Sequence, residues 1–322
     1  MTGLAVTMGD TARMTAAGTT AAVVARRAAE YRRGAWLVLG ATLAWSSAGI
    51  LARALDTDAW TTLFWRSVFA AISLLAYLAV RERGQALRPF RRLGLAGVGM
   101  AVCFAGSMIT FINALQLTTV AAVLIFQAAS PLFAAAMAWV FLGERVGLIK
   151  ALAIAGTLVG VLVMVSGAGG AGGLAGDALS ALMGLTFAGT IVLARARPGT
   201  PTSAALCLAV VMVALVSVPF ASLPATPRDF FLLALFGCVQ MGLGVVMFTA
   251  GVRLIPAADA GLLSVLECVL APVWVWLAYG EDPGRSTLIG GVIVMLSVLA
   301  ASRPDRGRQG ALPLDPAKGR GP

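Results

Sequence analysis

One carboxylate stands out within a long apolar stretch near the C-terminal end of the chain. Residues 261–281 read GLLSVLECVLAPVWVWLAYGE, and apolar or small residues surround Glu267 on both sides. Ser264 precedes Glu267 by three positions, so a helix would place both on one face. A carboxyl group at this depth can bind a cationic group or exchange a proton in a wet cavity. It can also be a protonated structural group that bonds a neighbouring helix, and the residues alone leave both interpretations open.

Other polar side chains occur at a similar depth in further apolar stretches. Gln127 and Ser130 are three residues apart and share a helix face, and Gln240 is central in another stretch. An amide in apolar surroundings needs hydrogen-bond partners, whereas single Ser and Thr hydroxyls usually bond their own helix backbone. Trp45 is as consistent with a packing role as with a role in substrate binding. The candidate substrate-binding set is Glu267, Gln127, Ser130, Ser264, Gln240, Trp45, Ser46, Ser107 and Thr186.

Three charged residues near the ends of apolar stretches are candidate gate residues: Arg66, Asp259 and Arg253. Arg66 is expected to extend toward the nearer membrane surface or to pair with Asp56 or Asp58, and a gate role is the alternative. Asp259 and Arg253 lie near the start of the stretch that contains Glu267. A surface ion pair or a charge at the helix start is the simpler interpretation of these two residues.

Several kinds of chemistry are excluded by the residues that the chain lacks. It contains no His, which removes His-based catalysis, His metal ligands and the HExxH motif of zinc proteases. An intramembrane aspartyl protease needs two central aspartates, and only Asp259 comes near the core of an apolar stretch. The cysteines lie in apolar stretches without metal-site spacing: Cys103, Cys207, Cys238 and Cys268. The sequence therefore predicts no enzyme, no metal site and no cofactor.

The composition is typical of a polytopic membrane protein. Of the 322 residues, 59% are hydrophobic and 12% are charged, whereas a soluble domain carries about a quarter charged residues. The net charge of +10 does not indicate a nucleic-acid partner, because the basic residues flank the apolar stretches. The lipid bilayer is the expected environment.

Ten apolar windows are long enough to be membrane-spanning helices, since a bilayer core requires about 20 apolar residues per helix. The last window is short and contains Gly290-Gly291. The predicted spans are 35–53, 60–80, 93–113, 119–142, 147–166, 174–194, 202–220, 230–250, 257–279 and 286–302.

The distribution of Lys and Arg predicts the orientation of these spans. Twenty basic residues fall on the side of the N-terminus, and three, Arg53, Arg228 and Arg285, fall on the other side. The positive-inside rule therefore places both termini in the cytoplasm. The expected location is the cytoplasmic (inner) membrane of a bacterium.

The two ends of the chain differ from the apolar middle. Residues 1–33 are rich in Ala and Thr and then basic, without the apolar core of a signal peptide. Residues 303–322 are rich in Pro, Gly and charge. Both are expected to be disordered cytoplasmic tails.

An internal repeat divides the middle of the chain into two units, 34–166 and 174–302. Residues 114–144 align without a gap with residues 251–281 at an offset of 137, and both stretches end at Gly-Glu. The alignment places Ser130 opposite Glu267. Five spans per unit would make the second unit cross the membrane in the opposite sense, as in the inverted repeats of secondary transporters.

The same stretches resemble a known family, the drug/metabolite transporter superfamily, and specifically its ten-span members with two EamA-like domains. Arg66 in LFWRSVF is similar to the arginine often found in the second span of that family. The family usually has Pro after the glutamate of the ninth span, but Cys268 stands here, so a local opening of this span is expected nearer Pro272. The resemblance rests on LTTVAAVLIFQAASPLF (117–133), FLGERV (141–146), IPAADAGLLSVLECVLAPV (255–273) and YGE (279–281).

The repeat and the resemblance together imply a secondary transporter, and the expected activity is export by alternating access. The substrate would be a small organic metabolite, such as an amino acid or related compound, or a lipophilic drug-like compound. Energy would come from a proton or substrate gradient, because no nucleotide-binding motif occurs. A monomer would be sufficient. The alternative is a membrane channel or receptor without active transport.

Overall fold

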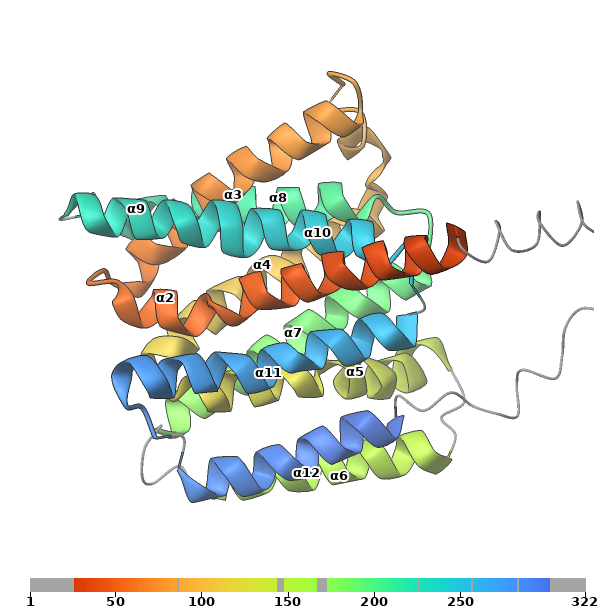
Figure 1. The fold of residues 1–322 in the computed structure, drawn as a ribbon, viewed down its shortest axis with the longest axis vertical. Coiled ribbons are helices and arrows are strands. Elements are labelled where there is room, and N and C mark those ends of the chain that lie inside the picture. Colours follow the sequence, from red (N-terminus) through yellow and green to blue (C-terminus); the bar gives the residue numbers. More distant parts are fainter. Residues whose placement is uncertain are drawn as a thin grey trace, which may run out of the picture.

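The computed structural model describes residues 26–301, apart from 86, 144–147, 167–172, 225, 256 and 283. Within these ranges all regular secondary structure is helical, and no strand occurs (Figure 1). Helices are the expected solution for a chain in lipid, because a helix satisfies its backbone hydrogen bonds internally.

The helices of the first half begin with an apolar helix, Arg26–Ala54, which has a turn at Ser47. Its last part is α2 (Ala48–Ala54). There follow α3 (Ala59–Arg81), the short 3-10 helix η1 (Phe90–Arg92), α4 (Gly94–Leu117), α5 (Val120–Leu142) and α6 (Leu148–Ser166).

The second half contains one irregular apolar segment, in which α9 (Pro227–Leu235), the π-helix η3 (Phe236–Leu243) and α10 (Gly244–Gly251) follow without a break. The remaining helices are α7 (Leu174–Ala196), α8 (Thr202–Ser217), the 3-10 helix η2 (Val218–Phe220), α11 (Ala257–Tyr279) and α12 (Arg285–Ala301).

Seven helices of the described residues are long and apolar enough to cross a membrane. Three further apolar helices are shorter: Ala151–Val163, Leu266–Tyr279 and Arg285–Ser297. Each of the ten windows expected from the sequence overlaps one of these helices. Large apolar side chains such as Leu95 and Val80 are 93% and 82% exposed, as expected for surfaces that face lipid.

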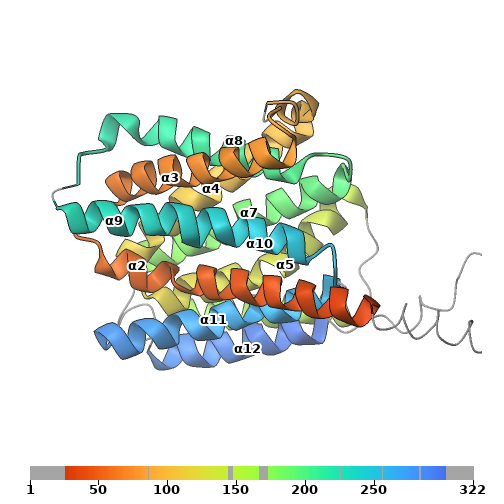
Figure 2. The same ribbon diagram turned by 45° about the horizontal axis from the view of Figure 1, so that its top comes forward.

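The helices lie alongside one another in a bundle (Figures 1 and 2). α3 packs against α8 at one end of the long axis, and α6 packs against α12 at the other end. The pairs α4/α7 and α5/α7 have extensive contacts between these ends, and α11 packs on α5 and α2.

Polar contacts show which helix ends meet. Arg53 near the end of α2 bonds the backbone oxygen of Leu115 near the end of α4, and it also contacts Glu281 just beyond α11. Glu281 in turn accepts a bond from the backbone N–H of Val120, the first residue of α5. α11 therefore ends where α5 begins, and the two helices run in opposite directions.

Matching features terminate these two helices. Gly143 after α5 and Gly280 after α11 both have φ of +66°, a left-handed conformation that glycine adopts without a steric penalty. Both helices continue through an internal proline, Pro131 and Pro272 respectively. The expected opening of α11 near Pro272 is not seen, because the helix is continuous from Ala257 to Tyr279.

Glycines allow close approach of the helix backbones. A Cβ at Gly237 in η3 would lie 2.4 Å from the backbone oxygen of Arg66 and 2.5 Å from Cβ of Phe69 in α3. A Cβ at Gly160 in α6 would lie 2.8 Å from the backbone oxygen of Gly290 in α12. Small residues at such contacts are a common means of helix association in lipid.

The contact at Gly237 yields a stability prediction. Gly237→Ala should destabilise the protein by about 1–3 kcal/mol, because backbone atoms of α3 must move to admit the methyl group. Gly106→Ala is the matched control, since a Cβ there would meet a Thr186 methyl carbon at an ordinary 3.6 Å. Thermal unfolding in detergent measures both variants. Equal midpoints for the two would show that the α3–η3 contact is not tight.

Candidate functional site

The central carboxylate lies at the crossing of α5 and α11. Glu267 is 6% exposed, and its Oε1 accepts a hydrogen bond of 3.2 Å from Nε2 of Gln127. The adjacent Cys268 donates its thiol to the backbone oxygen of Leu124 at 3.4 Å. No Lys or Arg of the described residues forms an ion pair with Glu267. The carboxyl group is therefore enclosed by protein, and its side-chain partner among the described residues is an amide rather than a cation.

The hydroxyl groups of the candidate set bond their own helices. Ser264 donates to the backbone oxygen of Ala260 at 2.9 Å, and Ser130 donates to that of Phe126 at 3.5 Å. Such bonds satisfy a hydroxyl without a partner from another helix. Ser107 and Thr186 behave likewise, toward Phe104 and Leu182.

Trp45 and Ser46 belong to the contact between the first helix and its neighbours. The rings of Trp45 and Phe248 of α10 are 5.0 Å apart. Ser46 accepts a hydrogen bond of 3.2 Å from Nε1 of Trp274 in α11. The hydrogen bonds of the described residues thus do not join these two side chains to Glu267.

Arg66 lies in the interior, which corrects the expectation from the sequence. Its side chain neither extends to a membrane surface nor pairs with Asp56 or Asp58, because it is 3% exposed and its Nη2 donates to Oε1 of Gln240 at 3.1 Å. Asp58 instead caps the start of α3, and Asp56 lies 3.7 Å from Arg228. The tight contact at Gly237 brings η3 close enough to α3 for Gln240 to reach the guanidinium.

The two remaining gate candidates are Arg253 and Asp259, and the structure describes the side chain of Arg253 alone. Arg253 is exposed in the turn after α10. Asp259 belongs to α11, and its side chain lies outside the described residues.

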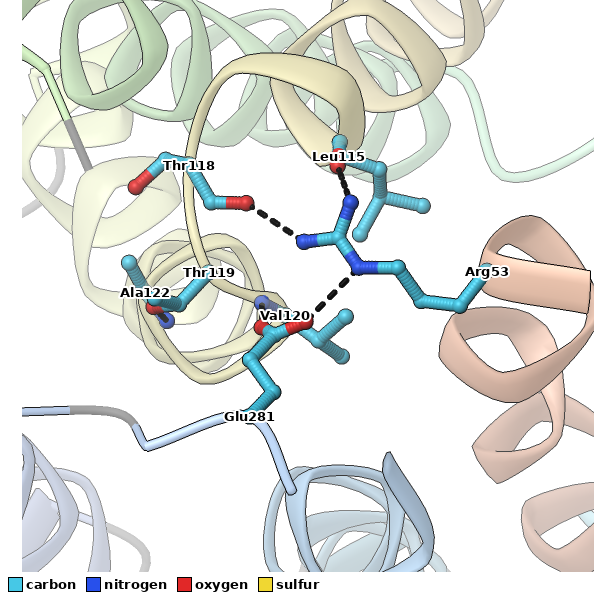
Figure 3. Close-up of polar contacts among 7 residues, drawn as sticks. All are labelled: Arg53, Leu115, Thr118, Thr119, Val120, Ala122 and Glu281. Carbon is cyan, nitrogen blue, oxygen red and sulfur yellow. Dashed lines mark hydrogen bonds and ion pairs between the residues drawn. The ribbon is translucent and has the colours of Figure 1, made fainter. Parts of the chain in front are cut away.

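A second polar cluster, not expected from the sequence, joins four helix ends (Figure 3). Nε of Arg53 is 2.7 Å from Oε2 of Glu281, and its Nη1 and Nη2 donate to the backbone oxygens of Leu115 and Thr118 at 2.6 and 2.9 Å. Oε1 of Glu281 accepts the bond from the backbone N–H of Val120 at 2.7 Å. We call these five residues the Arg53–Glu281 cluster.

The cluster ties the C-terminal ends of α2, α4 and α11 to the N-terminal end of α5. A carboxylate at a helix N-terminus also interacts favourably with the helix dipole. A cavity of about 270 Å³ lies beside it, lined by Arg53, Gln116, Leu117, Thr118, Thr119, Glu281 and Asp282. The only signal in the sequence was the Gly-Glu that ends both long stretches of the repeat, and it indicated no partner 228 residues away.

Two segments of the chain resemble a known protein family. Residues 32–166 and 174–303 each match the sequence profile of the EamA-like transporter family. The two matched segments have nearly the boundaries of the repeat units, and the resemblance inferred from the motifs is confirmed.

Individual relatives and a solved structure were also found. The Pseudopaline exporter CntI of Pseudomonas aeruginosa strain UCBPP-PA14 is 27% identical over 76% of this chain and 86% of that protein. The protein of the same name from strain PAO1 is 28% identical over the same shares. A structure described as the crystal structure of a protein aligns with a TM-score of 0.57 and 19% identity, over 83% of this chain and 95% of that chain, which shows the fold alone.

The Arg53–Glu281 cluster yields a prediction that does not depend on transport. Glu281→Ala should lower stability by about 1.5–3 kcal/mol, because it removes charge-assisted hydrogen bonds to Arg53 and Val120. Arg53→Ala should cost a similar amount, and the double variant less than the sum of the two. Thermal unfolding in detergent is the measurement.

The exposed ion pair between Asp56 and Arg228 is the matched control. Its side chains are 85% and 63% exposed, so Asp56→Asn should not change the unfolding midpoint. Additive effects of the Arg53 and Glu281 substitutions would indicate that the two side chains do not act together.

Proposed function

Because the chain belongs to the EamA-like transporter family, we propose that it is a secondary active exporter of a small organic metabolite that works by alternating access. It is an integral membrane transporter and not an enzyme. The proposal for its mechanism depends on one observation: the enclosed Glu267–Gln127 pair lies where α5 and α11 cross. Secondary transporters bind substrates near the midplane, at the interface of their repeats.

The inverted repeat is the architectural part of this proposal. α5 and α11 are equivalent in the alignment at offset 137 and run in opposite directions. The equivalent helices α3 and α8 pack on each other, as do α6 and α12. These contacts support a pseudo-two-fold axis in the membrane plane that relates residues 34–166 to 174–302, with ten spans in all.

The proposal also covers the direction of transport and the substrate class. The matched relatives are exporters, so export is the proposed direction here. An amino acid or a related compound, or a lipophilic drug-like compound, is the proposed substrate. The energy is proposed to come from a proton or substrate gradient, because the sequence contains no nucleotide-binding motif.

Glu267 is proposed to bind a cationic group of the substrate or to exchange a proton for it. A carboxylate enclosed by apolar groups needs compensation by a cation or by donors. An arriving cation would therefore stabilise the charged form, and substrate binding would be coupled to proton release. The competing interpretation is that Glu267 is a structural hydrogen-bonding group between α5 and α11.

Glu267→Gln separates these interpretations, because Gln keeps an oxygen that can accept the bond from Gln127. The variant should fold and insert like the wild type, but pH-gradient-driven flux in proteoliposomes should fall to the level of empty liposomes. Saturable counterflow distinguishes a carrier from a channel. Glu30→Gln, at an exposed ion pair with Arg26, is the control and should transport normally.

Unchanged flux and pH profile in Glu267→Gln, together with reduced stability of Glu267→Ala, would establish the structural role. If the flux through the wild-type protein does not saturate with substrate concentration, the protein is a channel and not a carrier.

The proposed topology has ten spans and both termini in the cytoplasm of a bacterial inner membrane. Reporter fusions after Leu55 and after the C-terminus should report opposite sides, because nine crossings separate the two positions. Activity of an alkaline phosphatase fusion and fluorescence of a green fluorescent protein fusion measure sidedness. The same side for both positions would refute the ten-span count.

A further inference from the structure

A buried guanidinium with unused hydrogen-bond donors lies between the two repeat units. Arg66 of α3 is 3% exposed, and its hydrogen bonds go to Gln240 Oε1 and, at 3.9 Å, to the sulfur of Met241. Its Nε and Nη1 are buried and have no hydrogen-bond partner among the described residues. No carboxylate of those residues forms an ion pair with it.

Aromatic rings compensate for part of the charge but not for the missing hydrogen bonds. The guanidinium carbon is 4.5 Å from the centre of the Phe236 ring and 6.0 Å from that of Phe111. A cation–π contact stabilises the positive charge, yet the N–H groups of Nε and Nη1 still lack an acceptor. Unsatisfied buried donors of this kind are costly.

The surrounding backbone is built around this side chain. Gln240 and Phe236 belong to the π-helical segment η3, and single π-helical turns are frequent at functional sites. The glycine at position 237 lets η3 approach the backbone of Arg66 directly. Arg66 and Phe111 belong to the first repeat unit, and Phe236 and Gln240 to the second, so motion of one unit against the other would open this contact.

We infer that Arg66 is a binding subsite for a carboxylate group of the transported molecule. A guanidinium presents N–H groups in a planar fork that matches the two oxygens of a carboxylate. The N–H groups of Nε and Nη1 lie on different edges of the guanidinium and both lack an acceptor, so a carboxylate can accept a hydrogen bond from either of them. Gln240 fixes the orientation of Nη2, the nitrogen that completes the fork on each edge. The apolar rings exclude water, which strengthens an ion pair formed there.

The site lies about 10 Å along α3 from its start at Ala59, at a rise of 1.5 Å per residue. Glu267 lies on α11, and its side chain is also hydrogen-bonded to a glutamine, Gln127. The two sites would thus have opposite charge preferences. The inference rests on the proposed transport function and narrows its substrates to molecules that carry a carboxylate.

The test uses twenty L-amino acids and their carboxamides as probes, since each pair differs only in the charge of one group. Ligand-induced thermal stabilisation of the detergent-purified protein gives an apparent Kd for each probe. At least one amino acid should bind the wild type about tenfold or more tightly than its amide. Arg66→Gln should abolish that preference, because it should weaken binding of the amino acid and leave binding of the amide unchanged.

Two further variants keep the test decisive if Arg66→Gln does not fold. Gln240→Glu places a carboxylate on the guanidinium, so it should raise the unfolding midpoint and weaken binding of the amino acid about tenfold. A purely structural Arg66 would give the higher midpoint with unchanged binding. Arg81→Gln is the matched control, because Arg81 lies exposed at the end of the same helix.

The outcomes separate this inference from the proposed function. The subsite is overturned if the wild-type protein prefers the amino acid over its amide in no pair, or binds none of the probes. It is also overturned if the preference survives in Arg66→Gln. Gradient-driven flux without a preference for carboxylates would support the exporter function and refute only the carboxylate subsite. Absence of gradient-driven flux for all probes, with carboxylate binding intact, would count against the exporter instead.

Discussion

Hydrocarbon offers no hydrogen bonds, and this constraint decides where every polar group of the bundle can lie. Most hydroxyls meet it locally, as Ser264 and Ser130 do on their own helices. Glu267 and Arg66 form no such bond to their own helices among the described residues, so they require a partner from another helix. The pairs Glu267–Gln127 and Arg66–Gln240 follow from this requirement, and both connect residues of different repeat units. These two central polar contacts are therefore also contacts between the two units.

The same constraint separates the ends of the bundle from its middle. At the helix ends, charged groups can bond free backbone groups, and the Arg53–Glu281 cluster does this for α4 and α5. In the middle, backbone groups are already paired, so a charge there has only other side chains to contact. An ion pair at the ends and two ionisable side chains bonded to glutamines in the middle are the result. The ends are thereby fixed by strong contacts, whereas Nε and Nη1 of Arg66 in the middle have no hydrogen-bond partner among the described residues.

Much of the fold could be predicted from the sequence, because length and apolarity determine a membrane helix. The expected span 257–279 has the limits of α11, and the family was identified from the repeat and its motifs. The inward position of Arg66 could not be predicted, since it depends on a glycine 171 positions away that lets η3 approach. The Arg53–Glu281 contact was missed for a similar reason. Apolar periodicity indicates which segments are helices, but it does not indicate which polar side chains of distant segments meet.

The π-helical segment has a consequence for the two faces of the helix that contains it. Hydrogen bonds from i to i+5 accommodate one additional residue in the turn. At the start of the π-helical segment, Gly237 adjoins α3, and after the segment, Gly244 and Gly251 adjoin Trp45 and Gly34 of the first helix. An uninterrupted α-helix, one residue shorter, would turn the later glycines by about 100°, away from that neighbour. The extra residue thus allows a single helix to pack closely against both α3 and the first helix. A one-residue deletion anywhere in 236–243 would turn the glycines away from one of these neighbours and bring larger side chains into steric conflict with it.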